Sequence, residues 1–154
     1  MNPQLLFLTT VAALTLAAQA SVFEIHAIER EGSVKTKAYT IENAGRKNTV
    51  NLNNDVLIDR TALLSATSIV ETTGGKKDRR SVAVLKLTFT TAGLRKFTEI
   101  TTALVGKQLG ILVDGKLVAT PAVLEALPGN SIRLTGNYSK EEADAMAAKI
   151  KGGT

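Results

Sequence analysis

Two apolar runs separated by Asp114-Gly115 form the clearest pattern in this chain. Leu109–Val113 and Leu117–Val118 are hydrophobic, and an Asp-Gly pair between such runs is typical of a tight β-hairpin turn. A type I′ turn needs positive φ at both central residues, which Asp tolerates and Gly adopts freely. Pro121 should end the second strand, because proline has no N–H to give to a ladder. The sequence therefore predicts a hairpin around this turn.

Alternation of apolar and polar positions predicts further strands. Ser21–Arg30 places Phe23 and Ile25 on one face and polar residues on the other, so we expect a half-buried strand there. The polar segment Glu42–Asn48 should be a loop between two more strands. The remaining expected strands are Val34–Ile41, Thr49–Ile58, Thr67–Thr72, Ser81–Thr90 and Ser131–Thr135. We expect Thr67–Thr72 and Ser81–Thr90 to pair as an antiparallel hairpin with a long loop.

Two principal helices are expected where apolar residues recur three and four positions apart. The first is Ala92–Leu104, with Thr90 or Thr91 as its N-cap. The second is Lys140–Lys151. It begins with Ser139-Lys140-Glu141-Glu142, a capping box in which Ser and Glu satisfy free N–H groups reciprocally.

A short helix over Ala62–Ala66 is expected as well, capped by Asp59 or Thr61. These elements predict an α+β fold, an antiparallel β-sheet with the two principal helices packed on it. We divide the chain into 1–20, a signal peptide, 21–60, a β-rich segment, and 61–154. The last two should form one compact domain.

The first residues indicate export. Leu5–Ala18 is an uninterrupted run of apolar residues and Thr, and Ala18-Gln19-Ala20 matches a signal-peptide cleavage pattern. The run is shorter than the roughly 20 residues that span a bilayer. We expect cleavage after Ala20, with the mature protein in the bacterial periplasm or cell envelope. The alternatives are an uncleaved membrane anchor and a buried helix.

Composition narrows the function. The formal net charge is +5, and there is no Cys, so neither a disulfide nor a thiolate metal site can form. Aromatic residues make up 4% and Trp is absent, which disfavours the stacking platforms of a single-stranded nucleic-acid binder. We expect no nucleic-acid partner. The positive charge suits an anionic surface, but at this modest net charge we favour simple solubility as its explanation.

No constellation of catalytic residues is visible in the sequence. His26 is the sole His, so we expect a strand histidine making ordinary hydrogen bonds rather than a metal ligand. Asp114 and Gly115 are explained by turn geometry. The acidic residues form no recognisable pair, and no Ser lies in a nucleophile motif. We therefore expect no catalytic residue, no cofactor and no metal, and a protein that is not an enzyme.

One basic stretch is a candidate contact site. Gly74 and Gly75 precede four cations, Lys76, Lys77, Arg79 and Arg80, between two expected strands. The spacing does not match a phosphate-binding loop, which would also precede a helix. These side chains can contact an anionic partner. The alternative is a solvated loop that resists aggregation of the strand edges.

The segment Val82–Gly153 resembles the head subdomain of SecD and SecDF, membrane proteins that assist the Sec translocon from the outer side of the bacterial inner membrane. The resemblance rests on the order of several pieces, and Leu57–Ser68 is similar to the lead-in found there. The pieces are Leu87-Thr88-Phe89 with Gly93 and Phe97, Thr101, Val105-Gly106-Lys107, Leu109 to Gly115, Pro121, Ile132, Gly136 and Glu141-Glu142-Ala143. It covers about two-thirds of the expected mature chain.

The resemblance implies a binding role rather than covalent chemistry. In the family, the head is thought to bind or guard the emerging preprotein, while proton-coupled work is attributed to a membrane bundle. We therefore expect a stand-alone exported binding module that contacts polypeptide or a membrane-protein partner. The alternative is a small periplasmic enzyme, or an anionic-ligand-binding protein, that uses Asp, Glu and the basic stretch.

Overall fold

The computed structural model describes residues 22–32, 35–126 and 129–152. The expected signal peptide, 1–20, lies outside this part, as does the beginning of the expected strand Val34–Ile41. The elements in chain order are β1 (Phe23–Glu29), β2 (Thr36–Asn43), β3 (Arg46–Asn53), β4 (Ile58–Asp59), η1 (Arg60–Ala62), β5 (Leu63–Thr73), β6 (Arg80–Phe89), α1 (Thr91–Ala103), β7 (Leu109–Val113), β8 (Lys116–Ala119), β9 (Ser131–Thr135) and α2 (Lys140–Gly152).

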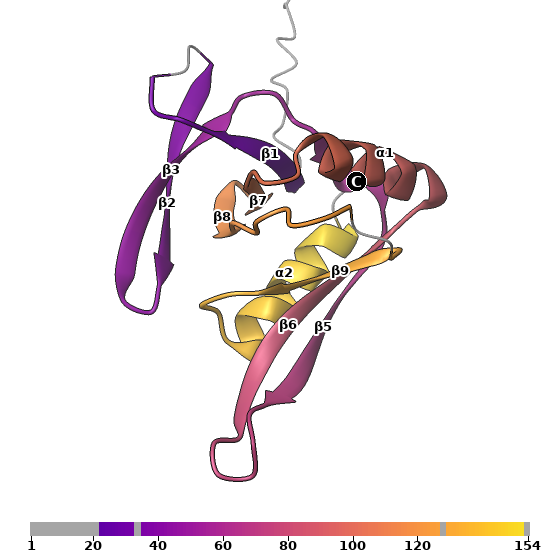
Figure 1. Ribbon diagram of the computed structural model, residues 1–154. Helices are drawn as coiled ribbons and strands as arrows, with labels where there is room; N and C mark the ends of the chain where they lie inside the picture. Colours follow the sequence, from indigo (N-terminus) through magenta and orange to yellow (C-terminus); the bar gives the residue numbers. More distant parts are fainter. Residues whose placement is uncertain (1–21, 33–34, 127–128, 153–154) are drawn as a thin grey trace, which may run out of the picture.

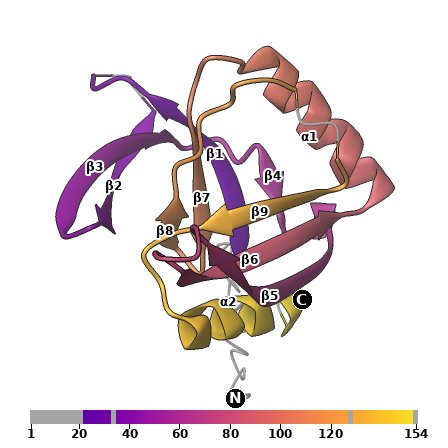
Figure 2. The ribbon, with the colours of Figure 1, turned by 60° about the horizontal axis from the view of Figure 1, so that its bottom comes forward.

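The strands form two antiparallel sheets, and the fold is α+β as predicted (Figure 2). The larger sheet has the order β2-β3-β1-β7-β8, with β4 paired to β1. The smaller sheet has the order β5-β6-β9, and α2 packs on β5 and β6. The hydrophobic pattern predicted individual strands but did not show that they divide between two sheets. No helix in the described part of the chain is long and apolar enough to cross a membrane.

The prediction of a loop at Glu42–Asn48 is wrong. β2 and β3 continue through most of it and are joined by a tight turn at Ala44-Gly45, where φ is 51° and 75°. The strand expected at Thr49–Ile58 is confirmed over Thr49–Asn53 and wrong beyond it, because β3 ends at Asn53 and β4 begins only at Ile58. The tip of the β2–β3 hairpin is exposed on both faces, so the residues next to the turn carry no alternating apolar pattern.

The strand expected at Ser21–Arg30 is confirmed as β1, but it is covered on both faces and not half-buried. Phe23 and Ile25 are fully buried in the main core. His26 points to the other face and is buried too. The β2–β3 hairpin, which we name the wing (residues 36–53), covers that second face. A small apolar cluster joins it to the sheet through Ile41, Leu52, Leu112 and Leu117.

The short helix expected at Ala62–Ala66 is wrong in position. Asp59 does act as a cap, but of the 3-10 turn η1, and Leu63 already belongs to β5. β5 pairs with β6 along its whole length, from Leu63 opposite Phe89 to Thr73 opposite Arg80. That ladder satisfies more backbone groups than one isolated helical turn could. The expected antiparallel pairing of these two strands is confirmed.

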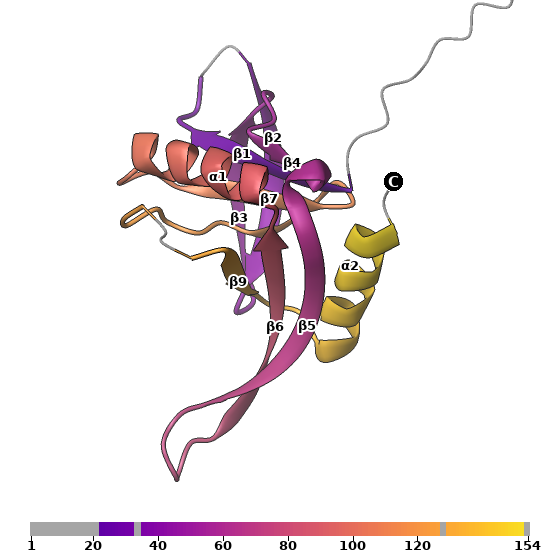
Figure 3. The same cartoon turned by 90° about the vertical axis from the view of Figure 1, so that its right-hand side faces the viewer.

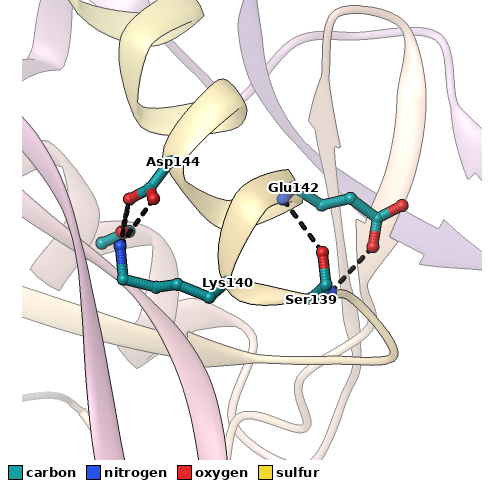
Figure 4. A network of polar contacts seen from close by, with 5 residues as sticks. Ser139, Lys140, Glu142 and Asp144 are labelled. Atoms are coloured by element: carbon teal, nitrogen blue, oxygen red, sulfur yellow. Dashed lines mark hydrogen bonds and ion pairs between the residues drawn. The ribbon is translucent and has the colours of Figure 1, made fainter.

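The two principal helices lie within one residue of their expected bounds. Thr90 caps α1, since its side-chain oxygen accepts from Gly93 N at 2.9 Å. The capping box of α2 is confirmed in both directions (Figure 4). Ser139 N donates to Glu142 Oε2 at 2.8 Å, and Glu142 N donates to Ser139 Oγ at 3.2 Å. Buried positions of α2 are Ala143, Ala147 and Ile150.

Candidate functional site

The basic stretch lies at the end of a long arm. The β5–β6 hairpin extends past α2, and its closing loop is the part farthest from the core (Figure 3). We name residues 74–80 the basic tip, and all of them are exposed. Gly74 has φ +98°, and a Cβ there would lie 2.1 Å from the carbonyl oxygen of Asp78. The loop therefore needs glycine at this position to close.

The cations of the basic tip have no ion-pair partner among the described residues. The ion pairs found in that part of the chain use other basic groups, namely His26, Arg133, Lys140 and Lys149. Asp78 is the sole acid within the tip. Lys76, Lys77, Arg79 and Arg80 thus present positive charge to solvent at the end of the arm.

The turn between β7 and β8 has the backbone of a type I′ turn. Asp114 has φ 52° and Gly115 has φ 75°. Asp114 Oδ2 also accepts from Lys149 Nζ of α2 at 2.6 Å. Both side chains are more than half exposed, so this ion pair links the turn to the helix at the surface. Thirty-five positions separate the two residues, and no sequence pattern indicates the contact.

A cleft of about 700 Å³ lies between the wing, the β7–β8 turn and α2. No local sequence pattern indicates this cleft, because its walls come from three distant segments. Its lining is apolar at Ile41, Val113, Leu117, Val118, Tyr138 and Met146. Its charged lining residues are balanced in sign: Glu42, Asp114 and Glu142 against Lys47, Lys116 and Lys149. The wing contributes four consecutive residues of β2, from Thr40 to Asn43.

The groups with shifted pKa values serve separate structural contacts. The Lys140 ammonium and the Ser68 hydroxyl bind the Asp144 carboxylate and lower its pKa (Figure 4). Hydrogen bonds from Thr61 lower the pKa of Asp59. Burial raises the pKa of Tyr138, whose hydroxyl donates to the carbonyl of Leu134. These groups lie at different places and do not converge on one point.

His26 makes the ordinary hydrogen bonds expected of it. Nδ1 lies 2.8 Å from the carbonyl oxygen of Asn53, and Nε2 lies 3.1 Å from Glu24 Oε2. The first contact joins β1 to the end of β3, and the second stays within β1. Within the described ranges, no group of three or more His, Asp or Glu side chains is placed to hold a metal ion.

Relatives of known name share sequence with this chain. SecDF of Thermus thermophilus, a protein translocase subunit, is 31% identical over 151 residues, covering 92% of this chain and 20% of the relative. SecD of Acidaminococcus fermentans is 34% identical over 77 residues, covering 50% of this chain and 18% of the relative. The chain thus spans about a fifth of the length of these curated relatives.

Solved structures show the same fold. A crystal structure of SecDF in a super-membrane-facing form matches with a TM-score of 0.62 at 23% identity, over 87% of this chain and 19% of the other. A second structure, of a SecDF membrane component that enhances protein export, matches with a TM-score of 0.60 at 22% identity, over 87% of this chain and 63% of the other. Residues 41–154 match the family model for the SecDF P1 head subdomain. The chain therefore belongs to the SecDF P1 head subdomain family.

Proposed function

We propose that this protein is a non-enzymatic binding module of protein translocation that contacts polypeptide or a membrane-protein partner. The observation that carries the proposal is the match of residues 41–154 to the P1 head of proteins named protein translocase subunits. The chain corresponds to the head, which is about a fifth of the length of such proteins. We therefore infer that the chain shares a contact surface with them.

The basic tip is one such surface. Its four cations stand at the end of the β5–β6 arm, away from the body of the domain (Figure 1). Unpaired surface cations attract acidic partners over about 10 Å at 0.1 M salt. An acidic segment of a polypeptide or of a membrane protein is the partner that this charge favours.

The alternative, a small enzyme or an anionic-ligand-binding protein that uses Asp and Glu, has less support. An active site generally gathers titratable groups with shifted pKa values in one cleft. Asp59 and Asp144 have lowered pKa values because of local hydrogen bonds, and neither lines the 700 Å³ cleft. The cleft does contain Tyr138, whose raised pKa follows from burial against the core.

The proposal includes an envelope location and one compact domain. The location rests on the signal-peptide pattern of residues 1–20 and on the membrane proteins to which the chain is similar. The single domain rests on the pairing of β1, from the segment 21–60, with β7, from 61–154. Five consecutive residue pairs, from Phe23 with Val113 to Ala27 with Leu109, join the two segments in the middle of the larger sheet.

Site-specific photo-crosslinking in the cell envelope tests the proposal. A photoreactive amino acid replaces Lys77 in the basic tip, and a control chain carries it at Arg95, an exposed position of α1. We expect the Lys77 position to capture exported proteins in transit or membrane proteins of the translocon, in amounts well above the Arg95 position. Equal capture from the two positions, or none from either, would contradict a role for the tip.

A further inference from the structure

The strand β2 lies at the edge of the larger sheet and faces the cleft. The strand order ends at β2, so one side of it bonds β3 and the other side forms no ladder, although β8 lies close to it. In Figure 1, β2 is the strand of the wing on the side of β8 and α2. Four successive β2 residues, Thr40 to Asn43, line the cleft, whereas β3 contributes only Lys47. A strand edge rather than a sheet face therefore forms this wall.

The register of the wing shows which backbone groups point into the cleft. In a hairpin with a two-residue turn, the flanking residues exchange both backbone hydrogen bonds, and bonded and non-bonded pairs then alternate. Asn43 and Arg46 flank Ala44-Gly45, so the next pair that bonds across the ladder is Ile41 with Asn48. The backbone N–H and C=O of Thr40 and Glu42 therefore point away from β3, toward the cleft.

A second hollow extends the cleft along other open edges. It measures about 260 Å³ and shares Ile41, Asn43 and Val118 with the first. It is lined by the end of β8 and by β9, which are also the terminal strands of their sheets. The two hollows adjoin each other at these three residues, and edge strands border both; we call them together the groove. This shape suits an extended chain better than a compact ligand.

We propose that an extended segment of polypeptide binds in this groove by adding as a strand to the open edge of β2. This inference rests on the proposed function and adds the site and the mode of contact. Strand addition uses main-chain hydrogen bonds for affinity, and alternate side chains enter pockets on one face. In this cleft, alternate side chains of the segment would meet the apolar floor formed by the partly exposed side chains of Val118, Tyr138 and Met146.

The lining explains why such a site would accept many sequences. Three acids and three bases line the cleft, so neither sign of charge on the segment is rejected. Met146 has an unbranched side chain, which adapts to differently shaped partners. Backbone recognition with an adaptable floor fits a polypeptide that presents changing sequence, whereas the basic tip would select acidic segments only.

Two proline variants test the proposal in matched positions. Thr40 and Thr49 are opposite each other in the wing, their hydroxyl oxygens are 3.3 Å apart, and both N–H groups point away from the β2–β3 ladder. Thr40→Pro removes an N–H from the cleft edge, and Thr49→Pro removes one from the opposite edge. Each change leaves the ladder bonds in place, as proline at an outward edge position should.

The probe is an uncharged fluorescent peptide of repeated Ser-Thr-Val-Gln, with binding followed by anisotropy. We expect Thr40→Pro to weaken binding roughly tenfold, because edge hydrogen bonds are lost and the ring obstructs the incoming strand. Thr49→Pro should bind like the unmodified protein. Equal affinity of both variants and the unmodified protein would overturn the proposal.

Amide hydrogen exchange on the unmodified protein gives a test that does not depend on how the variants fold. With saturating peptide, the amide protons of Thr40 and Glu42 should exchange more slowly, and the exchange of the Lys47 and Thr49 amides should be unchanged.

Binding without protection at Thr40 and Glu42 would overturn the edge site but leave the proposed function standing. Protection at these amides in the absence of peptide that increases with protein concentration would show a second copy of the chain as the occupant, and would also overturn the proposal. Failure to bind any unfolded polypeptide would count against both.

Discussion

Leu52 of the wing packs directly onto the backbone of Gly110 in β7. A Cβ at Gly110 would lie 2.3 Å from Leu52 Cδ2, closer than any real contact allows. Leu52 is 1% exposed, so its side chain has no free space into which it could turn. This contact holds the wing against β7 and thereby sets the wall of the cleft. Glycine inside a strand often marks such a close approach.

Gly110→Ala should therefore loosen the wing. Inserting a methyl group into a packed contact costs about 1–3 kcal/mol of unfolding free energy. Combining it with Leu52→Ala should cost less than the sum of the single changes, since the smaller side chain makes room for the new methyl. Urea unfolding of the four proteins measures this. Strict additivity would show that the two residues do not touch.

Gly93 in α1 is a second position where a side chain does not fit. A Cβ there would lie 2.1 Å from the carbonyl oxygen of Ala62. Helix propensity alone favours Ala over Gly by about 1 kcal/mol. We expect Gly93→Ala to be destabilising nevertheless, by at least about 2 kcal/mol, because a backbone carbonyl cannot rotate away as a side chain can. Arg95→Ala, at an exposed position of the same helix, is the control and should change the melting temperature little. A gain of stability in Gly93→Ala would contradict the packing described.

Two substitutions in the β7–β8 turn distinguish a structural role of this turn from a chemical role of the Asp114 carboxylate. Gly115 has φ +75°, so Gly115→Val should cost on the order of 1–3 kcal/mol through backbone strain. Asp114→Asn keeps a residue that tolerates positive φ and loses only an exposed ion pair with Lys149, worth about 0–1 kcal/mol. Thermal unfolding and partner binding should both be close to normal in Asp114→Asn. An unchanged melting temperature with lost function would show that the Asp114 carboxylate has a chemical role.

Asp144 should make a small contribution to acid sensitivity. The Lys140 ammonium, and then the Ser68 hydroxyl, hold its folded-state pKa below the ordinary value of 3.8. A carboxyl with a lowered folded pKa stabilises the fold above its unfolded pKa, and the contribution is lost as pH falls through the folded value. The stability difference between the unmodified protein and Asp144→Asn should therefore be larger near about pH 6 than near about pH 2. Urea unfolding at both pH values checks this, and a difference that grows in acid would contradict it.

The basic tip should be dispensable for folding. Replacing Lys76, Lys77, Arg79 and Arg80 with Ser changes only exposed side chains, and such changes usually stay within about 0.5 kcal/mol each. If the tip contacts an acidic partner, binding of a polyglutamate probe should weaken with salt and disappear in this variant. Binding that is insensitive to salt and unchanged in the variant would leave the tip as a solvated loop.

Elements with a strong local signal could be predicted from the sequence. The capping box at Ser139 and Glu142 and the N-cap Thr90 lie where local hydrogen bonding requires them. The Asp114-Gly115 turn is likewise determined by the φ values of its own two residues. None of these features depends on which distant strand lies beside it.

The wing and the cleft could not be predicted in the same way. The tip of the wing is exposed on both faces, so the residues of β2 and β3 next to the turn lack the alternation that burial imposes. The dipeptide Ala44-Gly45 was a weaker turn signal than Asp-Gly, although it adopts the same backbone. Contacts such as Arg133 Nη1 with Glu71 Oε1, at 2.9 Å, depend on the register of three strands. Local sequence does not contain that register.

If this domain binds unfolded polypeptide, as we propose, it should distinguish two states of one probe protein. Binding is measured by fluorescence anisotropy for a labelled destabilised protein in its unfolded state and for its stable, folded parent of nearly the same sequence. We expect saturable binding of the unfolded chain and little or no binding of the folded one, because an extended backbone is available only in the unfolded chain. Equal binding of both states, or no binding of the unfolded chain, would contradict the proposal.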